Sequence, residues 1–393
     1  MKEKSNLMIL SNGHGEDLIS SYLIKSLINK NEDINISVLP IVGKGNRFKN
    51  LPVEILGPRK VFPSGGVIRG NVKNLFNDIK SGLLNSTYKQ IKAIRNKRDS
   101  VNLSIVIGDI YALLLTGLFS NSDIIFIPTA KSEYIDGHYK VEKYLMKRYA
   151  MLVLPRDLKT TNDLINYGIN AKFHGNLMMD CFEINNIDFN LNSESNKIGL
   201  LPGSREESYD NMLDFIKVIK ELEKLKKEKN EFLTPVVSDF SIKKFKDKLI
   251  NHNWDIIEEN IDNDNIMMKI ISPSRLNTIY IINNGFGDVL DQAKLFIGMA
   301  GTANEQAVGM GKPVITFPSS GVQFSFEFAS NQKRLLGEGI KLMERDFKKV
   351  AYALIELLED EKEYIKRSTS GRKRMGEKGA IDDISNLIVK HLS

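Results

Sequence analysis

The chain has 393 residues, which at about 150 residues per domain predicts two to three domains. Its 42% hydrophobic and 26% charged residues are typical of globular proteins and exclude a disordered, collagen-like or coiled-coil chain. The single cysteine, Cys181, excludes an intrachain disulfide and a cysteine-based zinc site. We therefore expect a reducing, cytoplasmic compartment.

Positive charge is concentrated in one segment of the chain. The net charge is +6, and residues 59–98 alone hold ten basic residues and one acidic residue. Such a patch predicts an anionic partner, such as a membrane surface, and we expect no signal peptide and no membrane span. An ordinary solvated helix face remains the alternative. The predicted membrane contacts are Phe62, Arg69 and Lys73.

The first half of the chain alternates predicted strands and helices. Apolar runs predict strands at 6–10, 34–42, 103–109, 123–129 and 151–155. Helices are predicted at about 18–29, 72–96 and 138–149, whereas residues 57–70 are rich in Gly and Pro and predict a loop. This alternation is typical of βαβ units and a parallel sheet.

A polar, asparagine-rich segment at 183–196 predicts a linker, after which the alternation restarts. Residues 239–278 show no clear pattern, and the chain is predicted to be helical from about residue 348. Further strands are predicted at 197–203, 232–238, 279–283, 293–301 and 313–318, with a long helix at 210–229. We predict two Rossmann-like domains, at 1–182 and 197–370.

The loop at residues 11–17 (SNGHGED) follows the first predicted strand and opens a helix. Its glycines permit close backbone approach, and a helix N-terminus offers N–H groups to an anion or a sugar hydroxyl. His14 is predicted to be a base or a hydrogen-bond donor to an acceptor, whereas Asp17 is predicted to cap the helix. We assign to the acceptor side Asn12, Gly13, Gly15, Glu16 and Lys131.

Asp109 lies at the carboxyl end of a predicted buried strand. Polar residues at this place in open α/β sheets tend to face the ligand crevice, so Asp109 is a second candidate for the base. A helix cap or a salt bridge is the alternative, and the two readings stay open.

Two further loops join a strand to a helix. In the first, Gly203, Ser204 and Arg205 suit a phosphate, the alternative being a Ser204 cap and an Arg205–glutamate pair. In the second, the backbone N–H groups of Gly301, Thr302 and Ala303 open a helix and suit a diphosphate. Glu305 on its first turn is predicted to hold ribose hydroxyls, the alternative being a carboxylate that only complements the helix dipole.

These motifs together resemble lipid-A-disaccharide synthase and, more closely, the lipid-A-disaccharide-synthase-related proteins of cyanobacteria and plastids. The resemblance extends from about residue 6 to residue 384 and is carried by LLPGSR (200–205), GTANEQAVGMGKPV (301–314), FHGNLMMD (173–180) and the tail at 371–385. Asn176 stands where the synthase has a histidine. The Gly-His loop is more similar to that of the peptidoglycan N-acetylglucosaminyl transferase.

The resemblance implies a GT-B fold: two Rossmann-like, doubly wound parallel-sheet domains that face a central cleft, with residues 371–393 packing back on the first. It implies an inverting, metal-independent glycosyltransferase that moves a sugar from a UDP-sugar, the co-substrate, to a lipid or another membrane-associated acceptor. No cofactor is implied. In this scheme Ser204, Arg205 and the 301–303 loop hold the diphosphate, Glu305 holds the ribose, and His14 or Asp109 is the base.

Two other classes of function remain. A UDP-sugar 2-epimerase-like isomerase shares the fold and needs no acceptor, and a non-catalytic nucleotide-sugar-binding protein needs no base. We expect no nucleic-acid partner, because the positive charge is local and no recognition motif is present. The oligomeric state is left open.

Overall fold

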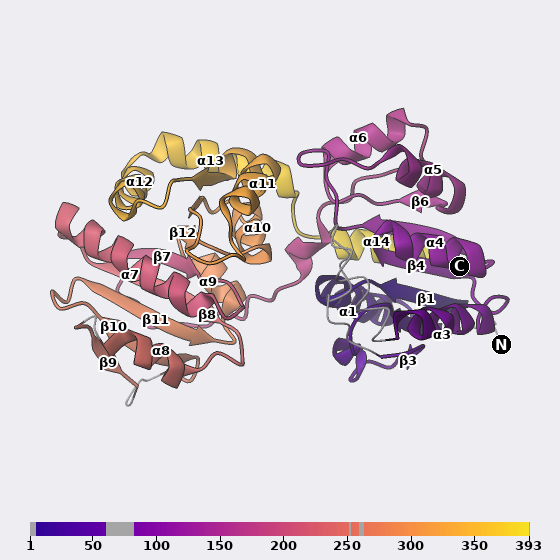
Figure 1. Ribbon diagram of the computed structural model, residues 1–393, viewed down its shortest axis with the longest axis horizontal. Coiled ribbons are helices and arrows are strands. Elements are labelled where there is room, and N and C mark those ends of the chain that lie inside the picture. Colours follow the sequence, from indigo (N-terminus) through magenta and orange to yellow (C-terminus); the bar gives the residue numbers. More distant parts are fainter. Residues whose placement is uncertain (1–4, 60–81, 251–252, 259–262, 393) are drawn as a thin grey trace. The chain divides into compact units, whose positions relative to one another are not determined.

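The computed structural model describes residues 5–59, 82–250, 253–258 and 263–392. The chain forms two compact units, one of Met1–Cys181 with Lys378–Ser393 and one of Phe182–Glu377 (Figure 1). The predicted membrane contacts Phe62, Arg69 and Lys73 lie outside the described residues.

The first unit is built on a parallel six-stranded sheet in the order β3-β2-β1-β4-β5-β6. Its strands are β1 (Ser5–Ser11), β2 (Ile34–Pro40), β3 (Glu54–Ile55), β4 (Leu103–Gly108), β5 (Asp123–Pro128) and β6 (Leu152–Val153). Its helices are α1 (His14–Lys30), α3 (Leu83–Asn96), α4 (Ile110–Phe119), α5 (Lys140–Tyr149) and α6 (Leu158–Asn166). The strand order reverses direction beside β1, so the switch point lies between β1 and β4.

Both faces of this sheet are buried. Along β1, Leu7 and Ile9 belong to one apolar cluster and Met8 and Leu10 to another, as expected for a strand covered on both sides. One cluster is completed by the C-terminal helix α14 (Ala380–Leu392), which packs against α1 and buries Ile381, Ile384 and Ile388.

The return of the chain to the first unit begins later than the predicted residue 371. Residues 371–375 are the last part of α13 (Glu361–Met375), which packs against helices of the second unit. The return is fixed by Asp180, whose carboxylate accepts hydrogen bonds from the backbone N–H groups of Gly379 (2.7 Å) and Ile381 (2.8 Å).

The second unit contains an eight-stranded sheet in the order β14-β13-β12-β7-β8-β11-β10-β9. Its strands are β7 (Asn196–Leu201), β8 (Asn230–Val236), β9 (Asp255–Ile257), β10 (Ile266–Ile271), β11 (Asn277–Asn283), β12 (Leu295–Gly298), β13 (Val314–Thr316) and β14 (Ile340–Leu342). Its helices are α7 (Ser208–Leu225), α8 (Ile242–Leu249), α9 (Phe286–Gln292), α10 (Thr302–Gly309), α11 (Phe326–Leu336), α12 (Phe347–Glu359) and α13.

Six of these strands repeat the topology of the first sheet. From the middle of the sheet, β7, β8 and β11 follow one another toward one edge, and β12, β13 and β14 follow one another toward the other edge. The switch point therefore lies between β7 and β12. The region 239–278, which showed no clear pattern, holds α8 and two short strands, β9 and β10. Because β10 is antiparallel to both β9 and β11, these strands extend the sheet beyond the Rossmann-like arrangement.

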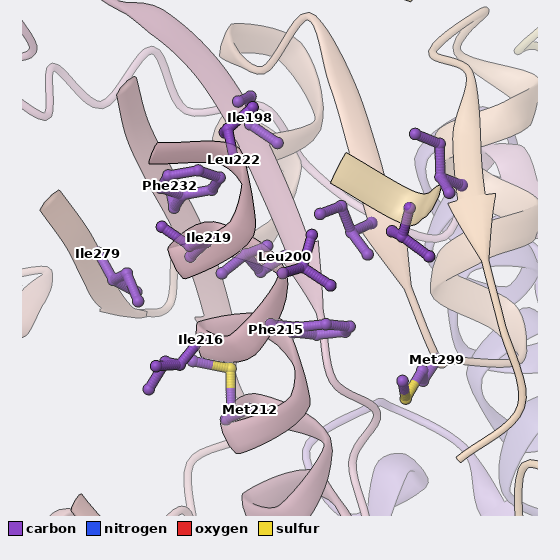
Figure 2. Packing of buried hydrophobic residues seen from close by; sticks show 14 of the residues in the cluster. Ile198, Leu200, Met212, Phe215, Ile216, Ile219, Leu222, Phe232, Ile279 and Met299 are labelled. Carbon is purple, nitrogen blue, oxygen red and sulfur yellow. The ribbon is translucent and has the colours of Figure 1, made fainter. Parts of the chain in front are cut away.

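The core of the second unit is formed where α7 lies on the sheet. Figure 2 shows Met212, Phe215, Ile216 and Ile219 of α7 beside Leu200 of β7, all of them fully buried. The apolar residues recur along α7 at helical spacing, so one face of the helix lies on the sheet. Residues 183–196, predicted as a linker, contain no strand or helix before β7 and belong to the second unit, where Asp288 accepts the N–H groups of Asn185 and Ile187.

Candidate functional site

A pocket of about 460 Å³ lies at the carboxyl ends of β7, β8 and β12, beside the switch point of the second sheet. Ligands of open α/β sheets bind at such a crevice. The pocket brings together six of the seven predicted donor-binding residues, which are Gly203, Ser204, Arg205, Gly301, Thr302 and Ala303.

The loop after β7 closely approaches the loop after β12. Gly203 has a φ of +92°, and a Cβ at this residue would lie 3.2 Å from the carbonyl oxygen of Met299. The N–H of Met299 in turn donates to the carbonyl of Leu201 at 2.8 Å, and the Asn211 side chain donates to the carbonyl of Pro202 at 2.9 Å. The glycine is therefore required both by its backbone conformation and by the closeness of the two loops.

Ser204 and Arg205 are both exposed in the pocket wall. The helix α7 begins only at Ser208, and its N-cap is Glu207. Ser204 therefore does not cap this helix, which was the alternative role predicted for it. Within the described part of the chain, Arg205 makes no ion pair, and the neighbouring Glu206 pairs with Lys244. Its guanidinium is thus available to an anion in the pocket.

The other wall of the pocket is the N-terminus of α10. Its N-cap, Gly301, provides no side-chain hydrogen bond, and the first backbone bond of the helix runs from Glu305 to the carbonyl of Gly301. The N–H groups of Thr302, Ala303 and Asn304 precede that bond and point out of the helix end, as first-turn N–H groups do. Together with the helix dipole they form an anion-binding surface.

Two buried amides hold this second loop in place. Gln332 of α11 donates to the carbonyls of Ala300 and Gly301, both at 3.0 Å, and its side-chain oxygen accepts from Asn304 at 3.1 Å. Asn304 also donates to the carbonyl of Gly298 at 3.3 Å. Sequence analysis missed these supporting residues, because α11 was not predicted.

Glu305 is not among the residues that line the pocket, whereas the next residue, Gln306, is. Glu305 is half-buried on the first turn of α10, and Gln306 is 4% exposed. One residue corresponds to a rotation of about 100° around a helix, so Glu305 and Gln306 point in different directions, and Gln306 lies on the side that lines the pocket. The geometry favours Gln306 as the contact of α10 with a ligand.

A loop at residues 319–323 closes part of the pocket rim and was also missed. The carboxylate of Glu207 accepts the N–H of Gln323 at 3.0 and 3.2 Å and the hydroxyl of Ser319 at 3.4 Å. The next residues bring Phe324, and then Phe328 of α11, into the pocket wall. The pocket therefore combines a polar, anion-binding side with an aromatic side that suits a flat ring.

The predicted acceptor-side residues lie at the carboxyl edge of the first sheet. The helix α1 begins at His14, directly after β1, so Asp17 lies inside the helix instead of capping it, and it accepts a hydrogen bond from buried Ser11 at 2.5 Å. Glu16 accepts from Thr129, just after β5, at 2.7 Å. The side chain of His14 lies outside what the structure describes.

Asp109 follows β4, the neighbour of β1 at the switch point of the first sheet. Its Oδ1 atom accepts the N–H groups of Tyr111 (3.0 Å) and Ala112 (3.3 Å), so the residue caps α4. The helix cap is the alternative role that the sequence left open for Asp109. The cap holds the carboxylate at the sheet edge that also carries residues 12–14, and its role as a base stays a prediction.

Lys131 is part of a charged cluster on α5 and the loop before it. Its ammonium donates to Glu142 at 2.8 Å and lies 3.6 Å from the centroid of the Tyr139 ring. Burial raises the pKa of Glu142, but the hydrogen bonds from Lys131 and from the Tyr139 N–H, together with the positive charge of Lys131, outweigh burial and hold the pKa below its usual value. Burial also lowers the pKa of His138, whose Nε2 atom has no hydrogen-bond partner among the described residues.

Two further properties are stated for the described residues alone. They contain no group of three or more His, Cys, Asp or Glu side chains placed to bind a metal ion. They also include no helix with the length and hydropathy that crossing a bilayer requires.

No family model and no curated protein matches this chain. Among solved structures it is similar to a UDP-GlcNAc 2-epimerase from Neisseria meningitidis bound to UDP-GlcNAc, with 13% identity, a TM-score of 0.61 and 98% and 100% of the two chains covered. It is also similar to MurG from Acinetobacter baumannii, with 12% identity, a TM-score of 0.59 and 98% and 99% covered.

A third similar structure is a calicheamicin glycosyltransferase, with 11% identity, a TM-score of 0.62 and 100% and 99% of the chains covered. At this level of identity the likeness concerns the fold. Together with the topology of the two sheets, it confirms the predicted GT-B fold class, with two Rossmann-like α/β domains.

Proposed function

We propose that the chain is a glycosyltransferase that binds a UDP-sugar in the pocket of the second unit and transfers the sugar with inversion, without a metal ion. The observation that carries the proposal is the convergence of Arg205 with the N-terminus of α10 across one pocket at the switch point. A diphosphate has the charge and the acceptor atoms to bind both. The similarity to structures of nucleotide-sugar enzymes supports the same reading.

The chemistry of sugar transfer explains why such a pocket would catalyse and not merely bind. When the bond from the sugar to the diphosphate breaks, negative charge develops on the leaving phosphate oxygen. The fixed N–H groups of α10 and the guanidinium of Arg205 stabilise this charge more strongly in the transition state than in the bound donor. The acceptor hydroxyl attacks from the opposite face and gives its proton to a base.

His14 and Asp109 are the two candidates for the base. We expect His14→Ala to retain UDP-sugar binding and to lose turnover. For Asp109 the informative variant is Asp109→Asn, because an asparagine oxygen can still accept the N–H groups that cap α4 and only the basic carboxylate is removed. Loss of turnover in only one of these variants assigns the base, and full activity in both removes the two residues from the mechanism.

The motif resemblance and the charge of the chain are the grounds for a proposal about the acceptor. We propose a lipid or another membrane-associated acceptor, as in the lipid-A-disaccharide-synthase-related proteins, reached by peripheral docking of the basic segment on anionic lipid. Charge reversal at Arg69 and Lys73 should then reduce sedimentation with anionic vesicles. Unchanged sedimentation would contradict the membrane proposal and leave the donor proposal intact.

A 2-epimerase is the second candidate, because epimerases are among the similar structures. It would use the same donor pocket without an acceptor. Incubation with UDP-GlcNAc alone separates the two: conversion to the 2-epimer supports the isomerase, whereas an unchanged donor supports a transferase.

The first experiment is a thermal shift of the purified protein against UDP, GDP, dTDP, CMP and ADP. A ligand at 100 times its Kd stabilises the folded state by about 2.7 kcal/mol. For a unit of this size that corresponds to roughly 5–10 °C in Tm. We expect a shift with UDP; a shift with another nucleotide alone would contradict the UDP assignment, and no shift at all would contradict a nucleotide donor bound without acceptor.

A further inference from the structure

A second, larger cavity lies on the second unit and shares no lining residue with the donor pocket. Its volume is about 870 Å³, and it is formed by the C-terminal half of α7, the start of α12 and the turns beside β9 and β10. Figure 1 shows α7 and α12 in this unit, where the two helices pack together. We call this cavity the α7 groove. Its basic wall residues are Lys217, Lys220, Lys224, Lys227, Arg345 and Lys348.

Four of these lysines form a row along α7. Lys217, Lys220 and Lys224 are separated by three and four residues and therefore lie on one helix face, and Lys227 follows just beyond the helix. Like charges at this spacing destabilise a helix, because neighbouring side chains lie only about 5–6 Å apart. A row of this kind is favoured where an anion bridges the ammonium groups.

The acidic residues of the α7 groove are already engaged with protein groups. Glu221 pairs with Lys224 at 2.6 Å, and Glu223 accepts a hydrogen bond from Asn277 at 2.8 Å. Asp346 caps α12 by accepting the N–H groups of Lys348 and Lys349. Glu221 therefore neutralises one lysine of the row, Lys224, whereas Glu223 and Asp346 are held by Asn277 and by the N-terminus of α12.

A single buried carboxylate, Asp214, organises one end of the α7 groove. It accepts three hydrogen bonds from Arg345, two at 3.0 Å and one at 2.8 Å, and pairs with Lys217 at 2.9 Å. Both cations also lie over the ring of Phe347, at 5.2 and 5.3 Å from its centroid. Two cations thus share one carboxylate, whereas Lys227 and Lys348 have no ion pair within the described ranges.

The lining of the α7 groove also includes Trp254, which is 7% exposed. Its indole nitrogen is buried and has no hydrogen-bond acceptor among the described residues. Buried N–H donors are normally paired, so an unpaired one calls for an explanation, and a bound ion or water is one of them. An anion can accept a hydrogen bond from the indole N–H and also balance the positive charge of the lysine row, which a neutral ligand does not do.

We propose that the α7 groove is a binding site for a small soluble anion that carries two or more phosphate groups. The phosphates lie along the lysine row, and one phosphate oxygen accepts the indole N–H of Trp254. The site is separate from the donor pocket and does not depend on the proposed function. Because cations on one helix are spaced at intervals of a helical turn, a ligand with several phosphates binds better than one with a single phosphate.

The test uses the fact that Trp254 is the only tryptophan of the chain. Inorganic triphosphate is titrated into the full-length protein while tryptophan emission is recorded. We expect a saturable change in emission, and a roughly tenfold higher Kd in Lys227→Glu and in Lys348→Glu, as for the loss of one charged hydrogen bond. Lys362→Glu makes the same charge change on exposed α13, outside the groove, and should leave the Kd nearly unchanged.

Two further variants locate the ligand. Trp254→Phe keeps an aromatic ring without the N–H, and calorimetry should give a roughly fivefold higher Kd for triphosphate. Arg205→Ala alters the donor pocket and should leave the emission titration unchanged. The proposal is overturned if emission responds equally in Lys227→Glu and wild type, if Arg205→Ala abolishes the response, or if only phosphatidylglycerol vesicles and not triphosphate produce one.

Discussion

Arg205 offers the sharpest test of the donor pocket, because its side chain makes no ion pair in the described structure and is exposed. Arg205→Ala should therefore leave the free energy of unfolding within about 0.5 kcal/mol of wild type. UDP binding should weaken, since a hydrogen bond to a charged group contributes about 1.5–3 kcal/mol. The open position of Arg205 favours the lower end of this range, which corresponds to a roughly tenfold higher Kd.

The assay is calorimetric titration of wild type and variant with UDP and, in parallel, with uridine. Uridine has no diphosphate, so its affinity should be the same in both proteins, and the difference for UDP should shrink when the salt concentration rises. Arg275→Ala removes an exposed arginine of the same unit away from the pocket and serves as the control. Equal loss of uridine and UDP affinity, or an unchanged UDP affinity, would refute the assignment of Arg205 to the diphosphate.

Four further predictions follow from the geometry. Gln306→Ala should weaken UDP binding more than Glu305→Ala, as measured by titration, and the reverse order would restore the ribose role predicted for Glu305. Burial lowers the pKa of His138, so the unfolded chain takes up a proton that the folded chain excludes as the pH falls below about 6.5. Stability in urea should therefore decrease from pH 7.5 to 5.5, and less so in His138→Gln. Burial raises the pKa of Cys181 to about 12, so a thiol reagent at pH 8 should label this residue only in denaturant. Phe215→Ala should destabilise the second unit by about 3–5 kcal/mol, followed by tryptophan emission in urea, whereas Phe215→Leu should cost much less.

Much of the donor pocket could be predicted from the sequence, because it is built from local signals. A short apolar run followed by Gly-Ser-Arg or Gly-Thr-Ala indicates a strand, a tight turn and a helix within ten residues. The position of Gly203 and of the 301–303 loop at neighbouring strand ends then follows from the topology of a doubly wound sheet.

The orientation of residues inside those helices could not be predicted in the same way. Glu305 lies on the first turn of α10, as predicted, but the helix start does not fix which side of the helix faces the pocket, and neighbouring residues differ by about 100°. The helix α11 and the 319–323 loop were missed because their contacts with the pocket are long-range hydrogen bonds. Gln332, for example, holds two carbonyls that lie more than thirty residues earlier.

The cavity along α7 was also outside the reach of sequence patterns. Its lysines read as a solvated helix face, which is the ordinary interpretation of such spacing. Only the structure places Arg345 and Trp254, from distant parts of the chain, beside that face.

The position of α14 has a consequence for biosynthesis. The second unit ends at Glu377, and the first unit lacks its last core helix until Lys378–Ser393 have been made. Domains usually complete folding in the order in which the ribosome delivers them. In this chain the order is inverted. The second unit can complete its fold before the first, because the apolar side of α1 stays uncovered until α14 is available. During this interval the nascent chain is exposed to aggregation and to holdase chaperones, and the first core closes only once Lys378–Ser393 can pack against α1.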